Sequence, residues 1–273
     1  MRSEIEQAVA LLRRGELVAF PTETVYGLGA DAANPAAVAK IFAAKGRPAD
    51  HPLIVHLPSA AHLARWAREV PPQAEQLASA FWPGPLTLIL KRQPNVPDAV
   101  TGGQDTVGLR VPSHPLALEL LAALDGGIAA PSANRFGRIS PTTAAHVREE
   151  LGKRVPLVLD GGACPVGIES TILDLSRGAP VLLRPGSISS AEIARVLGRA
   201  PETAAPQAET PRVSGSLEAH YAPRTPLQLV SSDGLLFALR NALVAGEKVA
   251  VLAPTLQAIT HDLVVWKQSP AEP

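Results

Sequence analysis

Short apolar runs alternate with alanine-rich segments of helical period through most of the chain before residue 200. This alternation is typical of an α/β domain, in which helices cover the faces of a sheet. The apolar runs that predict strands are residues 17–20, 53–57, 86–90, 107–111, 127–130, 157–159, 171–175 and 181–183. The segments that predict helices are residues 35–45, 60–68, 73–81, 115–124, 142–151 and 191–197, besides an amphipathic N-terminal helix that ends at Gly15.

Proline is the unusual residue, because its 27 copies are about twice the average usage in proteins. Several of these prolines directly follow expected strands, as in Phe20-Pro21, Val111-Pro112, Ala130-Pro131 and Arg184-Pro185. Proline ends a strand and restricts the direction of the loop that follows. We therefore expect stiff loops at the strand ends, which would form a good platform for a ligand.

The composition is that of a folded protein without net charge, with 46% hydrophobic residues and 25 basic against 25 acidic residues. This balance argues against a protein that binds nucleic acid mainly by bulk electrostatics. The single cysteine, Cys164, cannot form an intrachain disulfide, and no Cys/His group has zinc-site spacing. No apolar run approaches the ~18 residues of a membrane span. We therefore expect a cytoplasmic protein without a membrane segment or a protein-held metal.

The end of the chain differs in composition. Residues 199–226 contain five prolines and no periodicity, which is typical of a linker. Residues 227–230, 234–244 and 248–252 then predict a small strand-helix-strand unit. The predicted domains are residues 1–199, a linker at 200–226, and a small or truncated α/β domain at 227–273.

One candidate ligand loop follows the first expected strand. Thr22, Glu23 and Thr24 precede Gly27 and Gly29, so side chains and bare backbone can both approach a small polar ligand. A plain turn with satisfied threonine hydroxyls explains the same residues.

A second candidate lies at the end of the expected helix 35–45. Lys45 and Arg47 flank Gly46 and are suited to phosphate, lysine as a point charge and arginine as a bidentate fork. Cations that offset a helix dipole are the alternative. His51 and His56 follow without further metal-type neighbours.

Two arginines, Arg110 and Arg184, stand at the ends of apolar strands, where an unpaired guanidinium would be costly. Each requires a carboxylate, which either a substrate or a protein residue such as Glu169 or Asp174 would supply. Ser132 and Asn134 follow another expected strand, and their hydroxyl and amide groups suit phosphate or a nucleobase. A Ser/Asn turn is the alternative interpretation.

The familiar nucleotide and hydrolase motifs, including the Walker loop, G-x-S-x-G and G-x-G-x-x-G, are absent. The segments instead resemble, in one collinear order, the YrdC-like family of threonylcarbamoyl-AMP synthases. The matching segments are PTETVYGLG (21–29), KGRP (45–48), HPLIVH (51–56), PGPLT (83–87), VGLRVP (107–112), APSAN (130–134), ESTI (169–172) and LRPG (183–186). SGSLEAHYAP (214–223) resembles the linker of the longer members, whose second domain is usually larger than residues 227–273.

The resemblance implies a YrdC-like twisted open mixed sheet with flanking helices, plus a small C-terminal β-α-β unit that is partly Rossmann-like. It implies an enzyme, a nucleotidyltransferase that converts L-threonine, bicarbonate or CO2 and ATP with Mg2+ to threonylcarbamoyl-AMP and pyrophosphate. Partner proteins would then use this product to make threonylcarbamoyladenosine in tRNA. Direct tRNA binding is expected to be weak or absent.

Carried over residue by residue, the resemblance implies two groups of site residues. Threonine would be surrounded by Thr24, His56, Arg110, Ala130 and Ser170. ATP would be surrounded by Lys45, Arg47, His51, Thr106, Ser132, Asn134, Ser140, Arg184 and Tyr221. Lys45 and Arg47 are expected to be catalytic by stabilising charge on the phosphates, and the linker is expected to close over the nucleotide.

Two other functions remain open at the level of residue types. An RNA-binding module of the same fold is one alternative, although the neutral charge and the 4% aromatic content weigh against it. A hydrolase or transfer domain for carbamoylated nucleotides is the other.

Overall fold

The computed structural model describes residues 2–203, 211–213, 223, 225–253 and 260–268. The chain divides into two compact units, Met1–Ala222 and Pro223–Pro273, which we describe separately. None of the helices in the described ranges combines the length and apolar character needed to cross a membrane.

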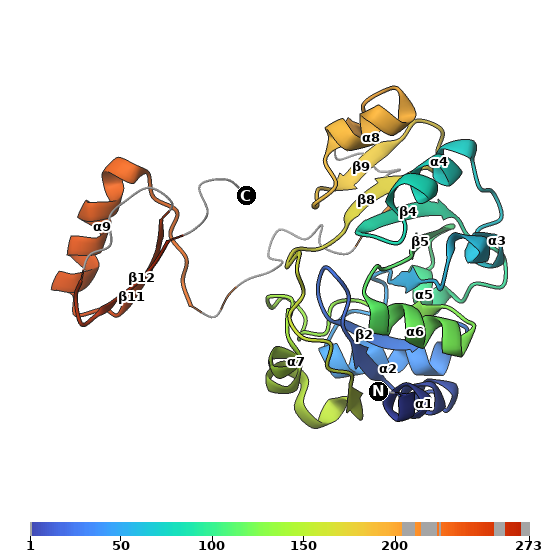
Figure 1. Cartoon of the computed structure of the whole chain (residues 1–273), viewed down its shortest axis with the longest axis horizontal. Coiled ribbons are helices and arrows are strands. Elements are labelled where there is room, and N and C mark those ends of the chain that lie inside the picture. Colours follow the sequence, from blue (N-terminus) through green and yellow to red (C-terminus); the bar gives the residue numbers. More distant parts are fainter. Residues whose placement is uncertain (1, 204–210, 214–222, 224, 254–259, 269–273) are drawn as a thin grey trace. The chain divides into compact units, whose positions relative to one another are not determined.

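Within the described residues, ten strands of the larger unit form one twisted mixed sheet (Figure 1). Across the sheet the order is β10 (Glu202–Thr203), β9 (Val181–Arg184), β8 (Thr171–Asp174), β4 (Leu86–Lys91), β5 (Thr106–Arg110), β3 (Ile54–His56), β6 (Ile128–Ala129), β2 (Gly27–Asp31), β1 (Val18–Phe20) and β7 (Leu157–Val158). The pairs β1–β7, β3–β5, β4–β8 and β9–β10 are parallel, and the other neighbours are antiparallel.

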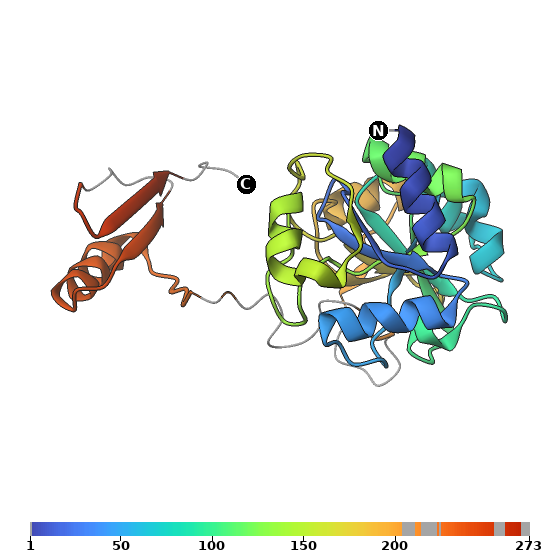
Figure 2. The same ribbon diagram turned by 90° about the horizontal axis from the view of Figure 1, so that it is seen from below.

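Helices flank this sheet on both faces. They are α1 (Arg2–Arg13), α2 (Pro35–Lys45), α3 (Leu63–Trp66), α4 (Pro72–Phe81), α5 (Asp98–Thr101), α6 (Pro115–Leu124), α7 (Ala144–Leu151) and α8 (Ser190–Leu197), with short 3-10 turns at Ala60–His62 and Gly152–Arg154. In Figure 2, α1 (dark blue) and α2 (mid-blue) lie on opposite sides of the strands.

Side-chain alternation along the strands produces two hydrophobic cores. Val18 and Phe20 of β1 pack with α1 and α6, whereas Ala19 between them belongs to the larger core on the opposite face. Successive strand residues point to opposite faces of a sheet, so a strand covered by helices on both sides is apolar at every position. This explains why the apolar runs in the sequence are continuous.

Local signals at both ends define α2. The Asn34 side chain accepts hydrogen bonds from two backbone N–H groups, Pro35 occupies the first turn, and Gly46 ends the helix with a left-handed φ of 64°. Lys45, the last residue of this helix, is thereby placed inside the domain and is only 3% exposed.

The expected fold class, a YrdC-like mixed sheet with flanking helices, is confirmed. The larger unit also contains β2, β10 and α5, which the sequence pattern did not predict. The expected loop at 21–29 runs only to Tyr26, because Gly27 begins β2.

Chain packing explains the glycines of β2. A Cβ atom on Gly29 would lie 2.7 Å from Ile128 Cγ2 and 2.8 Å from the Phe20 ring. The strand therefore requires glycine where the sequence suggested a turn.

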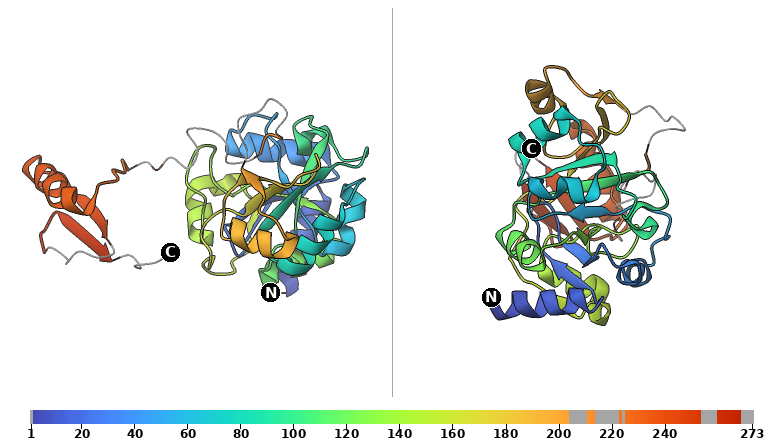
Figure 3. Two further views of the ribbon diagram at one scale, coloured as in Figure 1. Left: turned by 90° about the horizontal axis from the view of Figure 1, so that it is seen from above. Right: turned by 90° about the vertical axis from the view of Figure 1, so that its right-hand side faces the viewer.

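The smaller unit consists, in its described part, of α9 (Ser232–Val244) and the parallel strands β11 (Val249–Ala253) and β12 (Val264–Gln268). Leu239, Val251 and Ala253 form its core, and Figure 3 shows α9 (orange) along one side of the strands (red). The strand expected at 227–230 is wrong: this segment has no strand pairing, and Leu227 and Leu229 are 88% and 98% exposed. The unit is therefore not the expected β-α-β arrangement, since its helix precedes both strands.

Candidate functional site

A pocket opens where several strand ends and loops of the larger unit meet. It is lined by Thr22, Thr24, Val25, Gly27, Leu53, Ile54, His56, Arg110, Ala130, Pro131, Ser132, Glu169 and Arg184. The β1–β2 loop, β3, the end of β5, the segment after β6 and the end of β9 all contribute. The proline-bounded loops therefore meet at one place, as expected for a ligand platform.

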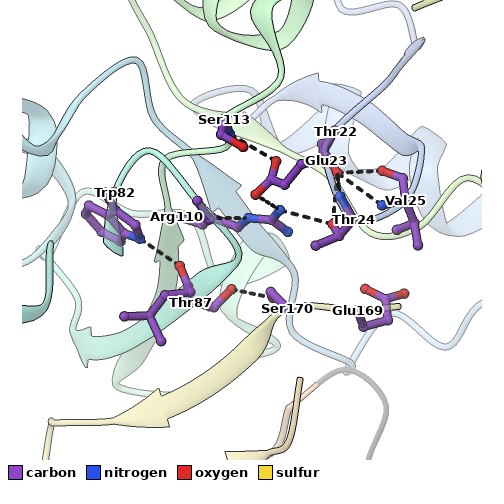
Figure 4. A network of polar contacts seen from close by, with 12 residues as sticks. Thr22, Glu23, Thr24, Val25, Trp82, Thr87, Arg110, Ser113, Glu169 and Ser170 are labelled. Carbon is purple, nitrogen blue, oxygen red and sulfur yellow. Dashed lines mark hydrogen bonds and ion pairs between the residues drawn. The ribbon is translucent and has the colours of Figure 1, made fainter. Parts of the chain in front are cut away.

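Arg110, at the end of β5, forms a buried ion pair within the protein (Figure 4). Its Nη2 donates to Glu23 Oε1 at 2.6 Å, and the other Glu23 oxygen accepts the backbone N–H of Ser113 at 2.9 Å. Arg110 and Glu23 are 3% and 6% exposed. The carboxylate that Arg110 requires is therefore supplied within the protein, by Glu23 of the β1–β2 loop and not by Glu169 or Asp174, the partners that the sequence suggested.

The remaining contacts of Arg110 leave one end of the guanidinium facing the pocket. Nη2 also donates to Thr24 Oγ1 at 3.0 Å, and Nε donates to the carbonyl of Gly84 at 3.3 Å. Within the described residues, Nη1 has no hydrogen-bond partner, although Arg110 lines the pocket. Glu23 thus fixes the side chain so that Nη1 can meet an acceptor in the pocket.

The threonine hydroxyls of the β1–β2 loop are largely satisfied by the loop itself. Thr22 Oγ1 donates to the carbonyl of Val25 at 2.6 Å and lies 2.9 Å from Thr24 Oγ1. Both the turn interpretation and the ligand interpretation apply here, because the same ordered loop lines the pocket.

Arg184, at the end of β9, is oriented by Ser170. Nε donates to the carbonyl of Ser170 and Nη2 to the Ser170 hydroxyl, each at 3.0 Å. The Ser170 hydroxyl also lies 2.8 Å from that of Thr87. The carboxylate of Glu169 is farther from Arg184 Nη2, at 3.7 Å, and its Oε1 accepts the hydroxyl of Ser140 at 2.8 Å.

Lys45 reaches the turn that follows β6. Its Nζ donates to the backbone carbonyls of Ser132 and Asn134, each at 2.5 Å. Burial, and next the positive charge of Arg47, lowers the pKa of Lys45 to about 7. Lys45 therefore orders the segment that carries two of the expected ATP contacts, besides its expected role at phosphate.

Asn134 is almost completely buried, and its amide nitrogen is hydrogen-bonded within the protein. Its Nδ2 donates to the carbonyls of Arg135 and Arg138, whereas its Oδ1 has no partner in the described part of the chain. A buried amide oxygen without a partner is costly and is often explained by a ligand or water.

His56, on β3, is 4% exposed and its ring meets that of Phe20 edge-on. Burial, and next the charge of Arg110, lowers the pKa of His56 to about 3, so the imidazole is neutral at neutral pH. Its Nδ1 has no hydrogen-bond partner in the described structure, and the residue lines the pocket. A ligand that offers or accepts one hydrogen bond would satisfy this nitrogen.

Six of the described residues expected at ATP lie outside the lining of this pocket: Lys45, Asn134 and Ser140, described above, and Arg47, His51 and Thr106. Arg47 is buried and donates to the carbonyl of Pro52 at 3.0 Å, and the His51 ring packs edge-on against Phe136. Thr106 lines a neighbouring pocket that shares Leu53 and Ile54 with the first one and is also lined by Arg212 and Val213.

Tyr221 lies outside the described residues, as does most of the expected linker. The described stretch 211–213 is fixed to the domain through Arg212. Its backbone N–H donates to Gln104 Oε1 at 2.7 Å, and its guanidinium donates to Asp50 at 3.1 Å and to the carbonyl of Gly102 at 3.2 Å.

The structure brings together at one pocket Thr24, His56, Arg110, Ala130, Ser132 and Arg184. Lys45 and Ser170 contact this group directly, and Ser140 contacts Glu169, which also lines the pocket. The residues carried over from the resemblance omit two carboxylates of the site, Glu23 and Glu169, although Glu23 belongs to the candidate loop and Glu169 was considered as an arginine partner. The signal was present, because both carboxylates stand inside the segments quoted above (21–29 and 169–172), next to residues that were selected.

Comparison with known proteins agrees with this geometry. Residues 10–186 match the family model of Sua5, YciO and YrdC proteins, which carries the description "Telomere recombination". The chain belongs to the Sua5/YciO/YrdC family. Residues 188–272 match a second model of this group, "Threonylcarbamoyl-AMP synthase, C-terminal domain". The resemblance inferred from the motifs is therefore confirmed.

Curated members of the Sua5/YciO/YrdC family are similar over most of the chain. A threonylcarbamoyl-AMP synthase of Pyrococcus abyssi is 47% identical over 83% of this chain and 68% of its own length. The enzyme of that name in Bacillus subtilis is 45% identical over 91% of this chain and 73% of its own length. The expectation of an enzyme is thereby confirmed.

Solved structures of the family give the same result. P. abyssi Sua5 complexed with L-threonine has a TM-score of 0.90 and 41% identity, and the match covers 100% of this chain and 82% of that one. HypF in its phosphate- and nucleotide-bound form, at 22% identity and a TM-score of 0.59, shows a shared fold alone.

Proposed function

We propose that this chain is a threonylcarbamoyl-AMP synthase that joins L-threonine, bicarbonate or CO2, and ATP into threonylcarbamoyl-AMP, releasing pyrophosphate. One observation carries the proposal: in a member of this family, two buried arginines, Arg110 and Arg184, line a single pocket and could take a carboxylate and phosphates. The alternatives, an RNA-binding module and a carbamoyl-nucleotide hydrolase, are not favoured, since the similar curated proteins are named synthases.

The threonine side of the pocket would be built by Thr24, His56, Arg110, Ala130 and Ser170. Arg110 Nη1 would hold the carboxylate, because Glu23, Thr24 and Gly84 already fix the other nitrogens. A guanidinium held by a buried carboxylate is preorganised, so little conformational entropy is lost when the substrate binds.

The ATP side would be built by Lys45, Arg47, His51, Thr106, Ser132, Asn134, Ser140, Arg184 and Tyr221. Arg184 would meet the phosphates, since its side chain lines the pocket and Ser170 orients its guanidinium through two hydrogen bonds. Lys45 and Arg47 would stabilise charge that develops as pyrophosphate departs.

Mg2+ would enter with ATP and neutralise charge on its phosphates. Among the described residues there is no group of three or more His, Cys, Asp or Glu side chains that could hold a metal ion. We therefore assign no protein ligand to Mg2+.

In the reaction, the amine of threonine becomes a carbamate, and a carbamate oxygen attacks the α-phosphorus in line with departing pyrophosphate. The protein would act mainly by positioning the two substrates and stabilising charge. Enclosure of the pocket would protect the carbamate and the mixed anhydride from water. The product would pass to the proteins that modify tRNA, with weak or no direct tRNA binding by this chain.

The test is turnover of radiolabelled ATP with threonine, bicarbonate and Mg2+ each omitted in turn. We expect an AMP-containing product only in the complete mixture. Equal ATP consumption without threonine would contradict the proposal, and tight, steeply salt-dependent RNA binding without ATP would favour the RNA-binding alternative.

A further inference from the structure

Glu169 is a charged residue that lines the pocket but has no part in the reaction as proposed above. Among the described residues that line the pocket, it is the sole carboxylate. Its side chain is 18% exposed and therefore remains accessible from the pocket. Figure 4 shows its carboxylate directed toward the side of the pocket where Thr24 and Val25 lie.

The two oxygens of Glu169 have different surroundings. Oε1 accepts the Ser140 hydroxyl at 2.8 Å, which fixes the direction of the carboxylate. The nearest cation to Oε2 is Arg184 Nη2 at 3.7 Å, a distance too long for a hydrogen bond. One carboxylate oxygen is thus held in place while the other keeps free lone pairs.

An α-amino acid enters such a pocket as a zwitterion, so it brings a cation as well as an anion. Arg110 is suited to the carboxylate, but the ammonium group requires an acceptor. The other charged or titratable groups that line the pocket are Arg184, which only donates, and His56, whose pKa of about 3 makes it a weak acceptor for a proton. Glu169 alone offers both negative charge and free lone pairs.

We propose that Glu169 binds the amino group of threonine and accepts the proton that leaves this nitrogen when the carbamate forms. This inference rests on the proposed function. The amino acid would therefore lie between Arg110 and Glu169, and the pocket would select substrates that carry both a carboxylate and an amine.

The ammonium group gives a proton to bicarbonate, which yields the free amine, CO2 and water. The nitrogen lone pair then forms a C–N bond to CO2, so the nitrogen becomes positively charged and far more acidic than an ammonium group. One N–H proton passes to Glu169 Oε2, which leaves a carbamate anion and a neutral Glu169. The carbamate oxygen can then attack the α-phosphorus, and Glu169 returns its proton to solvent after pyrophosphate leaves.

The test compares Glu169→Gln with the wild-type chain in calorimetric binding of two probes. The first probe is L-threonine, and the second is 2,3-dihydroxybutanoate, in which a hydroxyl replaces the amine. We expect Glu169→Gln to weaken L-threonine binding by about tenfold, as for the loss of one charged hydrogen bond. Binding of the amine-free probe should stay unchanged, and Glu69→Gln, on an exposed carboxylate, should change neither affinity.

Equal weakening of both probes would overturn the proposal, since it would assign Glu169 a structural role toward Ser140 and Arg184. A raised Mg2+ requirement with unchanged L-threonine binding would also overturn it and make Glu169 a metal ligand.

Steady-state kinetics test the role of Glu169 in proton transfer separately from its role in binding. Glu169→Gln should lower kcat, and Glu169→Asp should restore part of the loss. If the wild-type chain binds no L-threonine, the proposed function itself fails, which is a different outcome from a failure of Glu169.

Discussion

The two arginines of the pocket stand at equivalent places, each as the last residue of a strand of the large sheet, but their surroundings differ. Arg110 has a buried carboxylate at 2.6 Å, so its charge is neutralised by the protein. Arg184 is held by the carbonyl and hydroxyl of Ser170, and the pocket carboxylate of Glu169 lies 3.7 Å from its Nη2. The comparison teaches that burial alone does not define an arginine site, because the nearby negative charge decides how much of its positive charge is left for a ligand.

This difference matches the two substrates. A neutralised, oriented guanidinium suits a small monoanion, which needs direction more than charge. A guanidinium held by dipoles keeps its charge for phosphates, which carry several negative charges.

Substitution of the charge partner of Arg110 should lower the free energy of unfolding strongly, because the pair is buried. Glu23→Ala leaves a buried guanidinium without its counterion, and we expect a loss of about 3 kcal/mol in the free energy of unfolding. Urea unfolding of the full chain measures it. The exposed pair Lys40–Glu16, at 2.8 Å, is the control, since Glu16→Ala should cost less than about 1 kcal/mol.

A double variant sharpens this test. Adding Arg110→Met to Glu23→Ala removes the unpaired charge and should recover part of the lost stability. If Glu23→Ala is no more destabilising than Glu16→Ala, the buried pair is not a stabilising element of the site and the contrast with Arg184 fails.

The same contrast predicts a split in kinetics. Arg110→Lys loses the fork that meets Glu23, Thr24 and the pocket, so kcat/KM for threonine should fall by about tenfold or more, with a small change for ATP. Arg184→Lys should show the reverse pattern. Initial rates with each substrate varied in turn give both constants, and parallel changes in both would indicate a structural role for the arginine concerned.

Much of this architecture follows from local sequence, and the part that does not has a physical reason. Helices 35–45 and 115–124 have the predicted bounds, because proline in the first turn and a capping residue define each start. Strand β2 was missed since its glycines suggest a turn, and only packing against Phe20 and Ile128 explains them.

The ion pair of the site could not be predicted in the same way. Glu23 and Arg110 are 87 positions apart in sequence, and one sequence does not indicate which carboxylate meets which arginine. Sequence therefore predicted the need for a carboxylate at Arg110 but not its source. The strand expected at 227–230 failed for a related reason, since a short apolar alternation forms a strand only where a neighbouring strand pairs with it.

Lys45 gives a pH-dependent test of the phosphate side. Its folded pKa of about 7 lies below the ordinary value of 10.5, so the unfolded chain binds more protons between these values and this group's contribution to stability rises with pH there. Phosphates favour the charged amine, so ATP binding at pH ~8 should take up a fraction of a proton.

Calorimetry in two buffers of different ionisation enthalpy measures this uptake. We expect the apparent binding enthalpy to differ between the buffers for the wild-type chain, with a smaller difference for Lys45→Met. Equal differences in both proteins would mean that Lys45 does not sense the phosphates and serves only to hold the carbonyls of Ser132 and Asn134.

Removal of the smaller unit should have the smallest effect on activity, because both arginines belong to the larger unit. Among the residues that the structure describes, none beyond Leu197 belongs to the two large hydrophobic clusters, and Leu239, Val251 and Ala253 form a separate core. A chain cut after Thr225 should therefore keep kcat and both KM values within about twofold, since independent units contribute additively.

A chain cut after Thr203 is the matched control. It also lacks Tyr221 and Arg212, and Arg212 is the residue that bonds Gln104 and Asp50, so its use of ATP should be impaired. Loss of turnover in a folded chain that ends at Thr225 would show that the smaller unit contributes to the site.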